Sequence, residues 1–553
     1  MAPRNTIAAL LRKTPLFLPA REIYTTLSPS LRALRRVERD DLKRIKCCVG
    51  DALQQSLIPA DSTPHTVLIM GMGRVRFIAQ EAVIRKSFEL AGYRCVVLIP
   101  QDQMVIRAYQ QLGSDDLIFF DHYQSAEPRD GLDIIKECST LENVTAFMLN
   151  GVRCGKYAVS TLMRKSRTGA FDLSQPSVRE ELACALNRST QCAYTARALI
   201  DHVRPNALVL VDRGYSPSGE LFDTCIERDI PVFTWNAAHK NDALMLKRYT
   251  AANRDVHPSS LSEVTWQTLC AMPWTSEHGA AVRTELERCY SSGEWYAEVG
   301  TQFNKKAVDK ATLISRLGLD PSRKTAVIFP HIFWDATFFW GKDLFENYED
   351  WFIKTVQAAC RNDRLNWVIK VHPANLVKNR RDGVVSEHSE ITAIRKTVGE
   401  LPSHVKIMPA ETEISTLSLF NAIDCCVTVR GTVGIEAASF GVPVLTAGTG
   451  RYDRLGFTLD SETREEYLDR LANAHEITGL SCAQTKLALR HAWGVLLARP
   501  AKLEMVHMRY LANETADLKI DFQISTAEQL HTLNDLQAIS TWIRDGAEDY
   551  VQP

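Results

Sequence analysis

The stretch from Cys425 to Leu445 constrains the fold most strongly, because it is predicted as strand, turn, helix and strand in immediate succession. Residues 425–429 are apolar and rich in β-branched side chains, a pattern typical of a strand buried in a parallel sheet. Thr432 follows as a favourable N-cap for a helix, and Gly441 ends that helix. This succession predicts one βαβ unit of a doubly wound α/β fold.

The turn of this unit lies where ligands of open α/β sheets bind, outside the carboxyl ends of strands and at the N-termini of helices. We therefore expect Arg430, Gly431 and Thr432 to contact an anionic group, and Glu436 to accept hydrogen bonds from ribose hydroxyls. A plain βαβ turn with an acidic residue early in its helix would show the same residues. The stretch alone does not decide between a binding site and an ordinary connection.

Strands and helices alternate in two separate parts of the chain, which predicts two Rossmann-like lobes. Strands are expected near residues 67–70, 95–99, 117–120, 145–149, 207–211 and 231–234, and again near 325–330, 366–371 and 405–408. The predicted regions are a basic extension over 1–60, a first lobe over 61–250, a linker with short helices over 251–310, a second lobe over 311–475 and a helical segment over 476–553.

In the first lobe, Asp212 is the main candidate for catalysis, because it ends an apolar strand at the ligand edge of the sheet. A carboxylate there can serve as general base or nucleophile, or it can form an ordinary Asx turn. Glu220 and His239 are further candidates at the same edge. Gly71 and Gly73 could let backbone approach a ligand, but the third glycine of a dinucleotide fingerprint is missing, so a dehydrogenase is not favoured.

In the second lobe, an apolar strand ends in His372 and Pro373. Pro373 cannot continue a central ladder, so His372 is expected at the carboxyl end of the strand, where an imidazole can donate to a phosphate. A structural histidine at a strand end is the alternative. Asp335 lies in an aromatic-rich loop after another strand, and Arg451 lies in a glycine loop that could close over the same crevice.

Composition excludes several classes of protein. The 553 residues carry a net charge of −1, which gives no reason to expect a nucleic-acid binder. No apolar run approaches the roughly 18 residues of a membrane span, and Arg12 and Lys13 interrupt the only candidate signal segment. The 14 cysteines are scattered without a C-x-x-C pair, so we expect reduced thiols in the cytoplasm and no metal site.

Residues 1–46 are strongly basic, with 11 Lys and Arg against 4 Asp and Glu, a net charge of +7. Apolar residues alternate with the basic ones. Such a segment can dock on the inner membrane or on an assembly complex, or it can be a solvated helix or disordered arm.

Five segments taken together resemble bacterial capsule polysaccharide biosynthesis proteins. They are residues 333–337, 371–375, 428–436, 441–444 and 450–452. The resemblance covers about residues 325–470. It implies a metal-independent glycosyltransferase of the GT-B plan, with two Rossmann-like lobes, helical N- and C-terminal extensions, and no cofactor beyond its nucleotide-sugar donor.

Some members of the family transfer Kdo from CMP-Kdo. By this resemblance, His372 and Pro373 would bind the donor phosphate with Gly431 and Thr432, Arg430 would stabilise the leaving group, and Glu436 would bind the ribose. The acceptor would be a glycan or glycolipid. The acidic-acidic-glycine motif of similar bacterial sialyltransferases is absent, and Asp212 takes the place of the catalytic carboxylate.

Other functions fit the same predicted fold. A UDP-sugar transferase, a nucleotide-sugar 2-epimerase and a phosphotransferase using a CDP-polyol would all need a nucleotide site at this edge. A scaffold of a capsule-assembly complex, anchored by the basic N-terminus, would need none.

Overall fold

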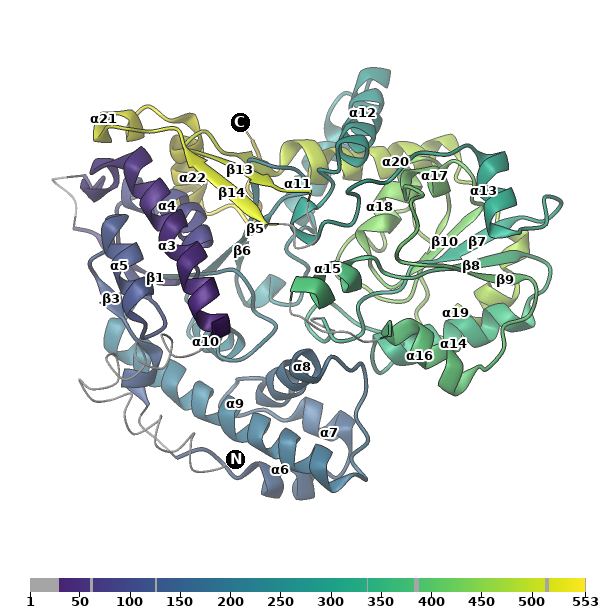
Figure 1. Ribbon diagram of the computed structural model, residues 1–553, viewed down its shortest axis with the longest axis horizontal. Helices are drawn as coiled ribbons and strands as arrows, with labels where there is room; N and C mark the ends of the chain where they lie inside the picture. Colours follow the sequence, from purple (N-terminus) through teal and green to yellow (C-terminus); the bar gives the residue numbers. More distant parts are fainter. Residues whose placement is uncertain are drawn as a thin grey trace.

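The computed structural model describes residues 29–59, 63–124, 127–335, 337–381, 387–512 and 517–552. Two β-sheets with helices on both faces form two lobes that lie side by side (Figure 1). The predicted pair of doubly wound α/β lobes is therefore confirmed. Residues 1–28 of the predicted basic extension lie outside the described residues.

The first lobe contains a seven-stranded sheet with the order β12-β6-β5-β4-β1-β2-β3. Its strands are β1 (His65–Met70), β2 (Tyr93–Leu98), β3 (Leu117–Ile118), β4 (Ala207–Leu210), β5 (Val232–Ala237), β6 (Ala243–Tyr249) and β12 (Pro500–Lys502). The first five strands run parallel, whereas β6 and β12 add two antiparallel pairings. The parallel part follows the Rossmann order, and its topological switch point lies between β1 and β4.

Helices cover both faces of this sheet, and some of them extend beyond it, toward the bottom of the view in Figure 1. They are α3 (Pro29–Val49), α4 (Val75–Leu90), α5 (Gln103–Gln111), α6 (Gly131–Cys138), α7 (Leu141–Ala146), α8 (Cys154–Ser166), α9 (Pro176–Val203) and α10 (Ser218–Ile226). One apolar core joins α3 and α4 to one face, and another joins α9 and α10 to the opposite face.

The second lobe contains a five-stranded parallel sheet with the order β11-β10-β7-β8-β9. Its strands are β7 (Thr325–Ile328), β8 (Asn366–Lys370), β9 (Val405–Met408), β10 (Cys425–Thr428) and β11 (Val444–Thr446). This is again the Rossmann order, with the switch point between β7 and β10. The βαβ unit predicted from 425–445 thus lies at the switch point itself.

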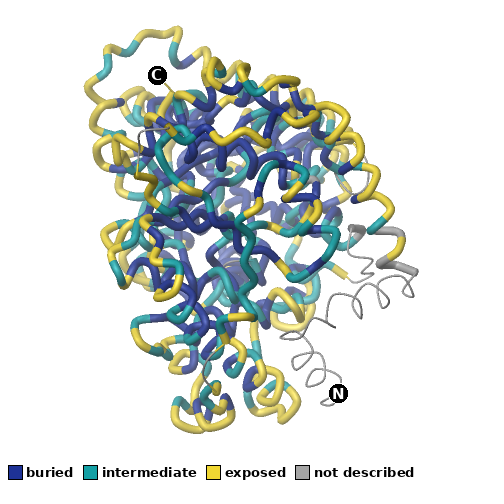
Figure 2. Tube along the Cα trace, turned by 90° about the vertical axis from the view of Figure 1, so that its left-hand side faces the viewer, coloured by how far each residue is buried: buried dark blue, intermediate teal, exposed yellow. Residues whose placement is uncertain are grey.

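The remaining helices flank the second sheet or join the lobes. They are α11 (Glu263–Ala271), α12 (Ser276–Ser292), α13 (Lys310–Leu317), α14 (Tyr348–Arg361), α15 (Ala374–Arg381), α16 (Ser389–Thr397), α17 (Leu417–Phe420), α18 (Thr432–Ser439), α19 (Arg464–Ala472) and α20 (Cys482–Trp493). Buried residues run through both lobes, and exposed ones gather on outer loops (Figure 2).

Two predicted elements are wrong. The strand expected at 145–149 is absent: residues 145 and 146 end α7, whose start is capped by the Thr140 side chain accepting from the N–H of Asn143 at 3.2 Å, and Leu149 makes only an isolated bridge to Val152. The C-terminal segment, expected to be helical, also contains β12 and the hairpin of β13 (Val506–Tyr510) and β14 (Leu518–Phe522).

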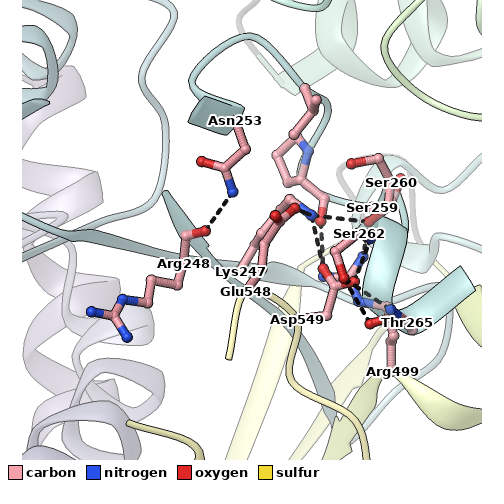
Figure 3. A network of polar contacts seen from close by, with 12 residues as sticks. Lys247, Arg248, Asn253, Ser259, Ser260, Ser262, Thr265, Arg499, Glu548 and Asp549 are labelled. Carbon is pink, nitrogen blue, oxygen red and sulfur yellow. Dashed lines mark hydrogen bonds and ion pairs between the residues drawn. The ribbon is translucent and has the colours of Figure 1, made fainter. Parts of the chain in front are cut away.

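The C-terminal segment returns to the first lobe. After β12, α21 (Ala527–Leu530) and α22 (Asn534–Asp545) follow, and α22 packs in the core around α4. Near its end, Asp549 lies in a buried network with Lys247 of β6 and Arg499, whose side chains point toward one another (Figure 3). Among the described residues, no helix is both long and apolar enough to cross a membrane.

The two lobes also share a core. Ile332 and Trp334, which follow β7, pack with apolar residues of α6, α8 and α9 from the first lobe. The aromatic-rich loop of the second lobe is therefore buried against the first one.

Candidate functional site

A cavity of about 230 Å³ opens at the carboxyl ends of β7, β8 and β10. Its wall includes the residues after each strand, the start of α18, and the segment after α12 that carries Trp295 and Tyr296. This is the switch point of the second sheet, where the topology places a ligand. Of the predicted donor-binding residues, His372, Pro373, Gly431, Thr432 and Glu436 line this cavity.

The N-terminus of α18 forms one wall. Gly431, rather than the predicted Thr432, is the N-cap, and no side chain caps the helix. Thr432 does not cap because its hydroxyl instead accepts from Arg451 Nη2 at 2.9 Å. Since the first N–H groups of a helix have no partner within it, those of Thr432 and Val433 are suited to an anionic ligand.

His372 is held in one tautomer. The backbone N–H of Ala374 donates to its Nδ1 at 3.2 Å, so a neutral ring carries its proton on Nε2. Burial, with the nearby Lys370 and Lys378 ammonium groups, lowers the pKa of His372 to about 3. The residue is therefore a neutral hydrogen-bond donor near pH 7, and the predicted contact with a phosphate would use Nε2–H.

Glu436 stands in the cavity wall one turn into α18. The Tyr290 hydroxyl donates to its Oε2, and only 3% of the residue is exposed. Burial raises the pKa of Glu436 to about 7, while the Tyr290 hydrogen bond and the charges of Arg451 and Lys370 oppose that rise. Its second oxygen remains available to a ligand hydroxyl, as expected for a ribose contact.

Several wall residues were not among the predicted site residues, and two of them, Lys370 and His331, carry ionisable groups near His372 and Arg430. Lys370 ends β8 with 7% exposure, and no hydrogen-bond or ion-pair partner for it occurs among the described residues. Burial lowers the pKa of Lys370 to about 8, so the ammonium is still charged at pH 7. It precedes His372 by two residues, the spacing of side chains on one face of a strand, so this signal was present in the sequence.

His331, which follows β7, is the second. Its ring stacks on Tyr348 with centroids 4.4 Å apart, and its Nε2 accepts the backbone N–H of Arg430 at 3.3 Å. Burial and the Arg430 charge hold the pKa of His331 well below its usual range, so the ring is neutral. Finding it from the sequence would have required the knowledge that β7 lies between β8 and β10.

Arg430 and Arg451 lie beside the cavity. The Arg430 guanidinium points toward Asp343 and the carbonyl of Lys342, to which Nη2 donates at 3.2 Å. Arg451 donates to Thr432 and, from Nη1 at 3.3 Å, to the carbonyl of Arg430. Both arginines therefore hold the turn between β10 and α18, and neither lines the cavity.

Asp212 follows β4 at the switch point of the first sheet, as predicted. The N–H of Gly214 donates to its Oδ1 at 2.9 Å, so the Asx turn is present, and Arg164 Nη1 lies 3.4 Å from Oδ2. Although 42% of the side chain is exposed, desolvation by the surrounding protein raises the pKa of Asp212. The carboxylate is thus accessible and more basic than usual.

A chain of contacts links this position to the second lobe. Arg164 lies over the ring of Tyr215 at 4.4 Å, and the Tyr215 hydroxyl donates to Asp335 Oδ1 at 2.7 Å. Lys378 of α15 donates to the other oxygen of Asp335 at 2.6 Å. These contacts lower the pKa of Asp335 to about 2, which suits a positioning residue better than a base.

The other first-lobe candidates are not at an open edge. Glu220 is fully buried and accepts from Ser189 and Ser216, each at 2.5 Å. Burial raises the pKa of Glu220 to about 7. A Cβ at Gly71 would meet the Tyr109 hydroxyl at 2.2 Å, and one at Gly73 would meet Pro100, so close packing accounts for both glycines.

His239 is buried behind Trp295, with Nε2 2.9 Å from Glu285 Oε1. In the described part of the chain, His239, Glu285 and Cys289 are the one group with three potential metal ligands close together. Lys240 donates to the same Glu285 oxygen at 3.1 Å, and Arg288 donates to the other at 3.0 Å. The Glu285 charge is already neutralised by cations, which disfavours a metal ion there.

The family match to known proteins covers the lobe that holds the cavity. Residues 292–491 match the family model described as capsule polysaccharide biosynthesis protein. The match covers 200 of the 553 residues. The matched residues include the whole cavity wall except Tyr290. No curated protein matches the sequence.

Solved structures show more distant likeness. The beta Kdo 2,4 transferase of Thermosulfurimonas dismutans KpsC is 15% identical, with a TM-score of 0.32 over 52% of this chain and 79% of that one. The beta Kdo 2,7 transferase of the same protein is 12% identical, with a TM-score of 0.33 over 59% and 85%. A Neisseria meningitidis UDP-GlcNAc 2-epimerase is 12% identical, with a TM-score of 0.26 over 78% and 96%. Likeness at this level does not assign an activity.

Proposed function

We propose that this protein is a glycosyltransferase of capsule or related surface polysaccharide synthesis. It would transfer a sugar from a pyrimidine nucleotide-sugar donor to a glycan or glycolipid acceptor. The donor would bind in the second-lobe cavity, and the acceptor would enter from the first lobe.

One observation carries this proposal. Within a segment that matches a capsule-synthesis family, the cavity brings together the His372 donor, the Lys370 ammonium, the free N–H groups of α18 and the buried Glu436 carboxyl. The first three suit an anionic phosphate, and the fourth suits a ribose hydroxyl. A nucleotide presents both groups at a short distance from one another.

Glycosyl transfer from such a donor breaks the bond between the anomeric carbon and the nucleotide phosphate. The phosphate leaves with the bonding electron pair, and the fixed donors of the cavity stabilise the charge that develops on it. A new bond forms to an acceptor oxygen. Asp212 would take the proton of that hydroxyl, since its carboxylate is exposed, has a raised pKa and lies at the switch point of the facing lobe.

The resemblance of the His372–Pro373 pair to that of CMP-Kdo transferases makes CMP-Kdo the donor to test first. A UDP-linked sugar is the alternative donor in the same cavity. A nucleotide-sugar 2-epimerase would turn over its substrate without an acceptor, whereas a CDP-polyol phosphotransferase would transfer the polyol phosphate to an acceptor and release CMP from the CDP-polyol. A scaffold would bind no nucleotide.

A thermal-shift panel with CMP, CDP, UDP and GDP tests the proposal. A ligand at 100 times its Kd adds about 2.7 kcal/mol to the free energy of unfolding, which raises the midpoint visibly. We expect one pyrimidine nucleotide to stabilise the wild type, His372→Ala to weaken that binding at least about tenfold, and His372→Gln to retain part of it through its N–H group. The exposed His531→Ala serves as the control.

Selective stabilisation by CMP supports a Kdo-type donor. Selective stabilisation by UDP supports a UDP-linked donor and leaves the proposed glycosyltransferase activity unchanged. The release of CMP from CMP-Kdo would then be measured with and without candidate acceptors. If no nucleotide stabilises the protein and no nucleotide sugar is consumed, the proposal is wrong and a scaffold role remains.

A further inference from the structure

Helix α3 presents an unusual outer surface. Leu42, Ile45 and Val49 bury its apolar side in the core of the first lobe. The opposite side faces solvent, and most of its charged residues are basic.

Five exposed basic residues form a single row along this helix. They are spaced by four, three, four and three positions: Arg32, Arg36, Arg39, Lys43 and Lys46. This spacing places them on one stripe of an α-helix. None of the five has a hydrogen-bond or ion-pair partner in the described ranges of the chain. We call this set the α3 basic row.

Three acidic residues near the row are paired with other cations, and a fourth, Asp40, is exposed on the same helix. Asp102 pairs with Arg35, and Glu38 lies 3.3 Å from Arg74 and 4.0 Å from Arg35. Asp41 pairs with Arg44 at 3.0 Å on a different side of the helix. The row is therefore locally positive in a chain whose net charge is −1.

The positive surface continues beyond the end of α3. Lys46 and Arg107 of α5 border the same shallow depression, with Asp51 as the acidic residue on its rim. At the other end, Arg35 reaches Asp102 and Glu38 reaches Arg74, both just after strands of the first sheet. Helix α3 thus runs from the side where β1 and β2 end outward along the first lobe (Figure 1).

We propose that the α3 basic row binds the surface of an anionic lipid membrane. A straight, convex row of unpaired Lys and Arg side chains can contact many headgroups at once, and polybasic segments bind anionic leaflets through the summed attraction. Because α3 begins beside the carboxyl ends of β1 and β2, such contact would hold this edge of the first lobe near a lipid-linked acceptor. Only this last consequence rests on the proposed function; the binding itself does not.

Vesicle cosedimentation of the full chain tests this proposal. We expect binding to vesicles of phosphatidylcholine mixed with phosphatidylglycerol, and little to phosphatidylcholine alone. Raising the salt from about 0.1 M to about 0.5 M should release the protein, because it shortens the range of the attraction. The variant R36E/R39E/K43E should bind at least about tenfold more weakly.

A second variant with the same charge change provides the control. Lys310, Arg316 and Lys486 are exposed, lie on the second lobe or on α20, and have no partner among the described residues. K310E/R316E/K486E should bind vesicles almost like the wild type. Nucleotide-induced thermal shifts should be equal in the wild type and both triple variants. A failure of the proposed function would therefore appear as missing thermal shifts and not as a loss of vesicle binding.

Three results would overturn the proposal. The wild type could ignore anionic vesicles at low salt, or both triple variants could lose binding equally, which would indicate general charge attraction. R36E/R39E/K43E could also retain wild-type binding, which would place any membrane contact elsewhere, including residues 1–28. Equal affinity for RNA and for anionic vesicles would likewise contradict a specific role at lipid.

Discussion

At the scale of single residues, Lys370 combines a structural cost with a use in binding. The residue is only 7% exposed, its side chain has no hydrogen-bond or ion-pair partner among the described residues, and burial lowers its pKa from 10.5 to about 8. The folded state therefore binds fewer protons than the unfolded state between these two values, and the stability cost is fully present below pH 8. Such a residue is retained where a ligand supplies the missing negative charge.

Lys370→Met should therefore raise stability and reduce function. We expect the free energy of unfolding at pH 7 to increase by about 1–3 kcal/mol, with the gain shrinking as the pH approaches 10.5. Nucleotide affinity, measured by calorimetry, should fall at least about tenfold. Lys486→Met, at an exposed position, should change neither. A destabilised Lys370→Met variant would show that the ammonium has a favourable partner in the protein itself.

Asp212 and Glu220 give a matched pair for the catalytic base. Asp212→Asn keeps an oxygen for the Gly214 N–H but removes the base, so turnover should fall about 10²–10⁴-fold while nucleotide still binds. Glu220→Gln keeps an acceptor for Ser189 and Ser216 inside a closed site, so turnover should change only a few-fold. Steady-state rates that reverse this order would move the base to Glu220.

What the sequence predicts about single residues depends on how local the signal is. His372, Gly431 and Glu436 each stand beside a strand end or turn that is visible in the sequence, and the structure places them in one cavity. His331 lies after β7, and its contact with Arg430 depends on the order of strands in the sheet. Strand order is a property of long-range pairing, so short sequence patterns do not contain it.

At the scale of elements, the short helix α18 depends on close packing. Gly434 lies beneath Tyr452, whose hydroxyl donates to the carbonyl of Gly431 at 2.7 Å. A Cβ at Gly434 would come within 2.2 Å of that hydroxyl. The turn that presents the helix N-terminus is thus held by an aromatic ring that only glycine accommodates.

Gly434→Ala should destabilise the protein by about 1–3 kcal/mol, because the buried Tyr452 ring must move. The same displacement should weaken nucleotide binding, since it releases the Gly431 carbonyl at the cavity wall. Gly479→Ala is the control, because its Cβ would meet no atom closer than 3.7 Å and its stability should change by less than about 0.5 kcal/mol. Urea unfolding and calorimetry measure the two effects. Equal behaviour of the two variants would contradict this account of the turn.

The elements predicted best are those whose apolar pattern is strong along the whole segment. The run 425–428 and the helix 348–361 carry strong apolar patterns, and both occur as expected. β6 and β12 were not predicted, because they are antiparallel additions at the edge of the sheet, and β12 is only three residues long. The strand expected at 145–149 failed for a different reason, since only one of its five residues is β-branched and its first two residues continue the helix that Thr140 caps.

At the scale of the whole molecule, the C-terminal segment packs on the first lobe, the lobe that also carries α3. The C-terminal segment crosses from α20 to β12 and pairs with β6, and α22 then packs on α4. The lobes also share the core around Ile332 and Trp334. The pairing of β12 with β6 and the core around Ile332 and Trp334 join segments more than a hundred residues apart, so no short sequence pattern contains these two links.

The contact that fixes this return is Asp549, which joins three distant parts of the chain. Its Oδ1 accepts from Lys247 of β6 at 2.8 Å and lies 3.3 Å from Arg499, and its Oδ2 accepts the N–H of Ser262 at 2.6 Å. The side chains of Lys247, Arg499 and Asp549 are all fully buried (Figure 3). Removing the carboxylate would leave two buried cations without their shared counter-ion.

Asp549→Ala should therefore lower the free energy of unfolding by about 3–5 kcal/mol at pH 7, the usual cost of breaking a buried ion pair. Its partners hold the pKa of Asp549 well below the ordinary value of 3.8, so its stabilisation is complete above that pH and is lost as the pH falls below it. The gap between wild type and variant in urea unfolding should accordingly close in acid. Glu548→Ala, which removes a 30% exposed partner of Lys247, should cost about 1 kcal/mol or less. If Asp549→Ala cost no more than this control, the C-terminal return would be held by apolar packing alone, and the backbone carbonyls that accept from Lys247 and Arg499 would be enough to stabilise these two cations.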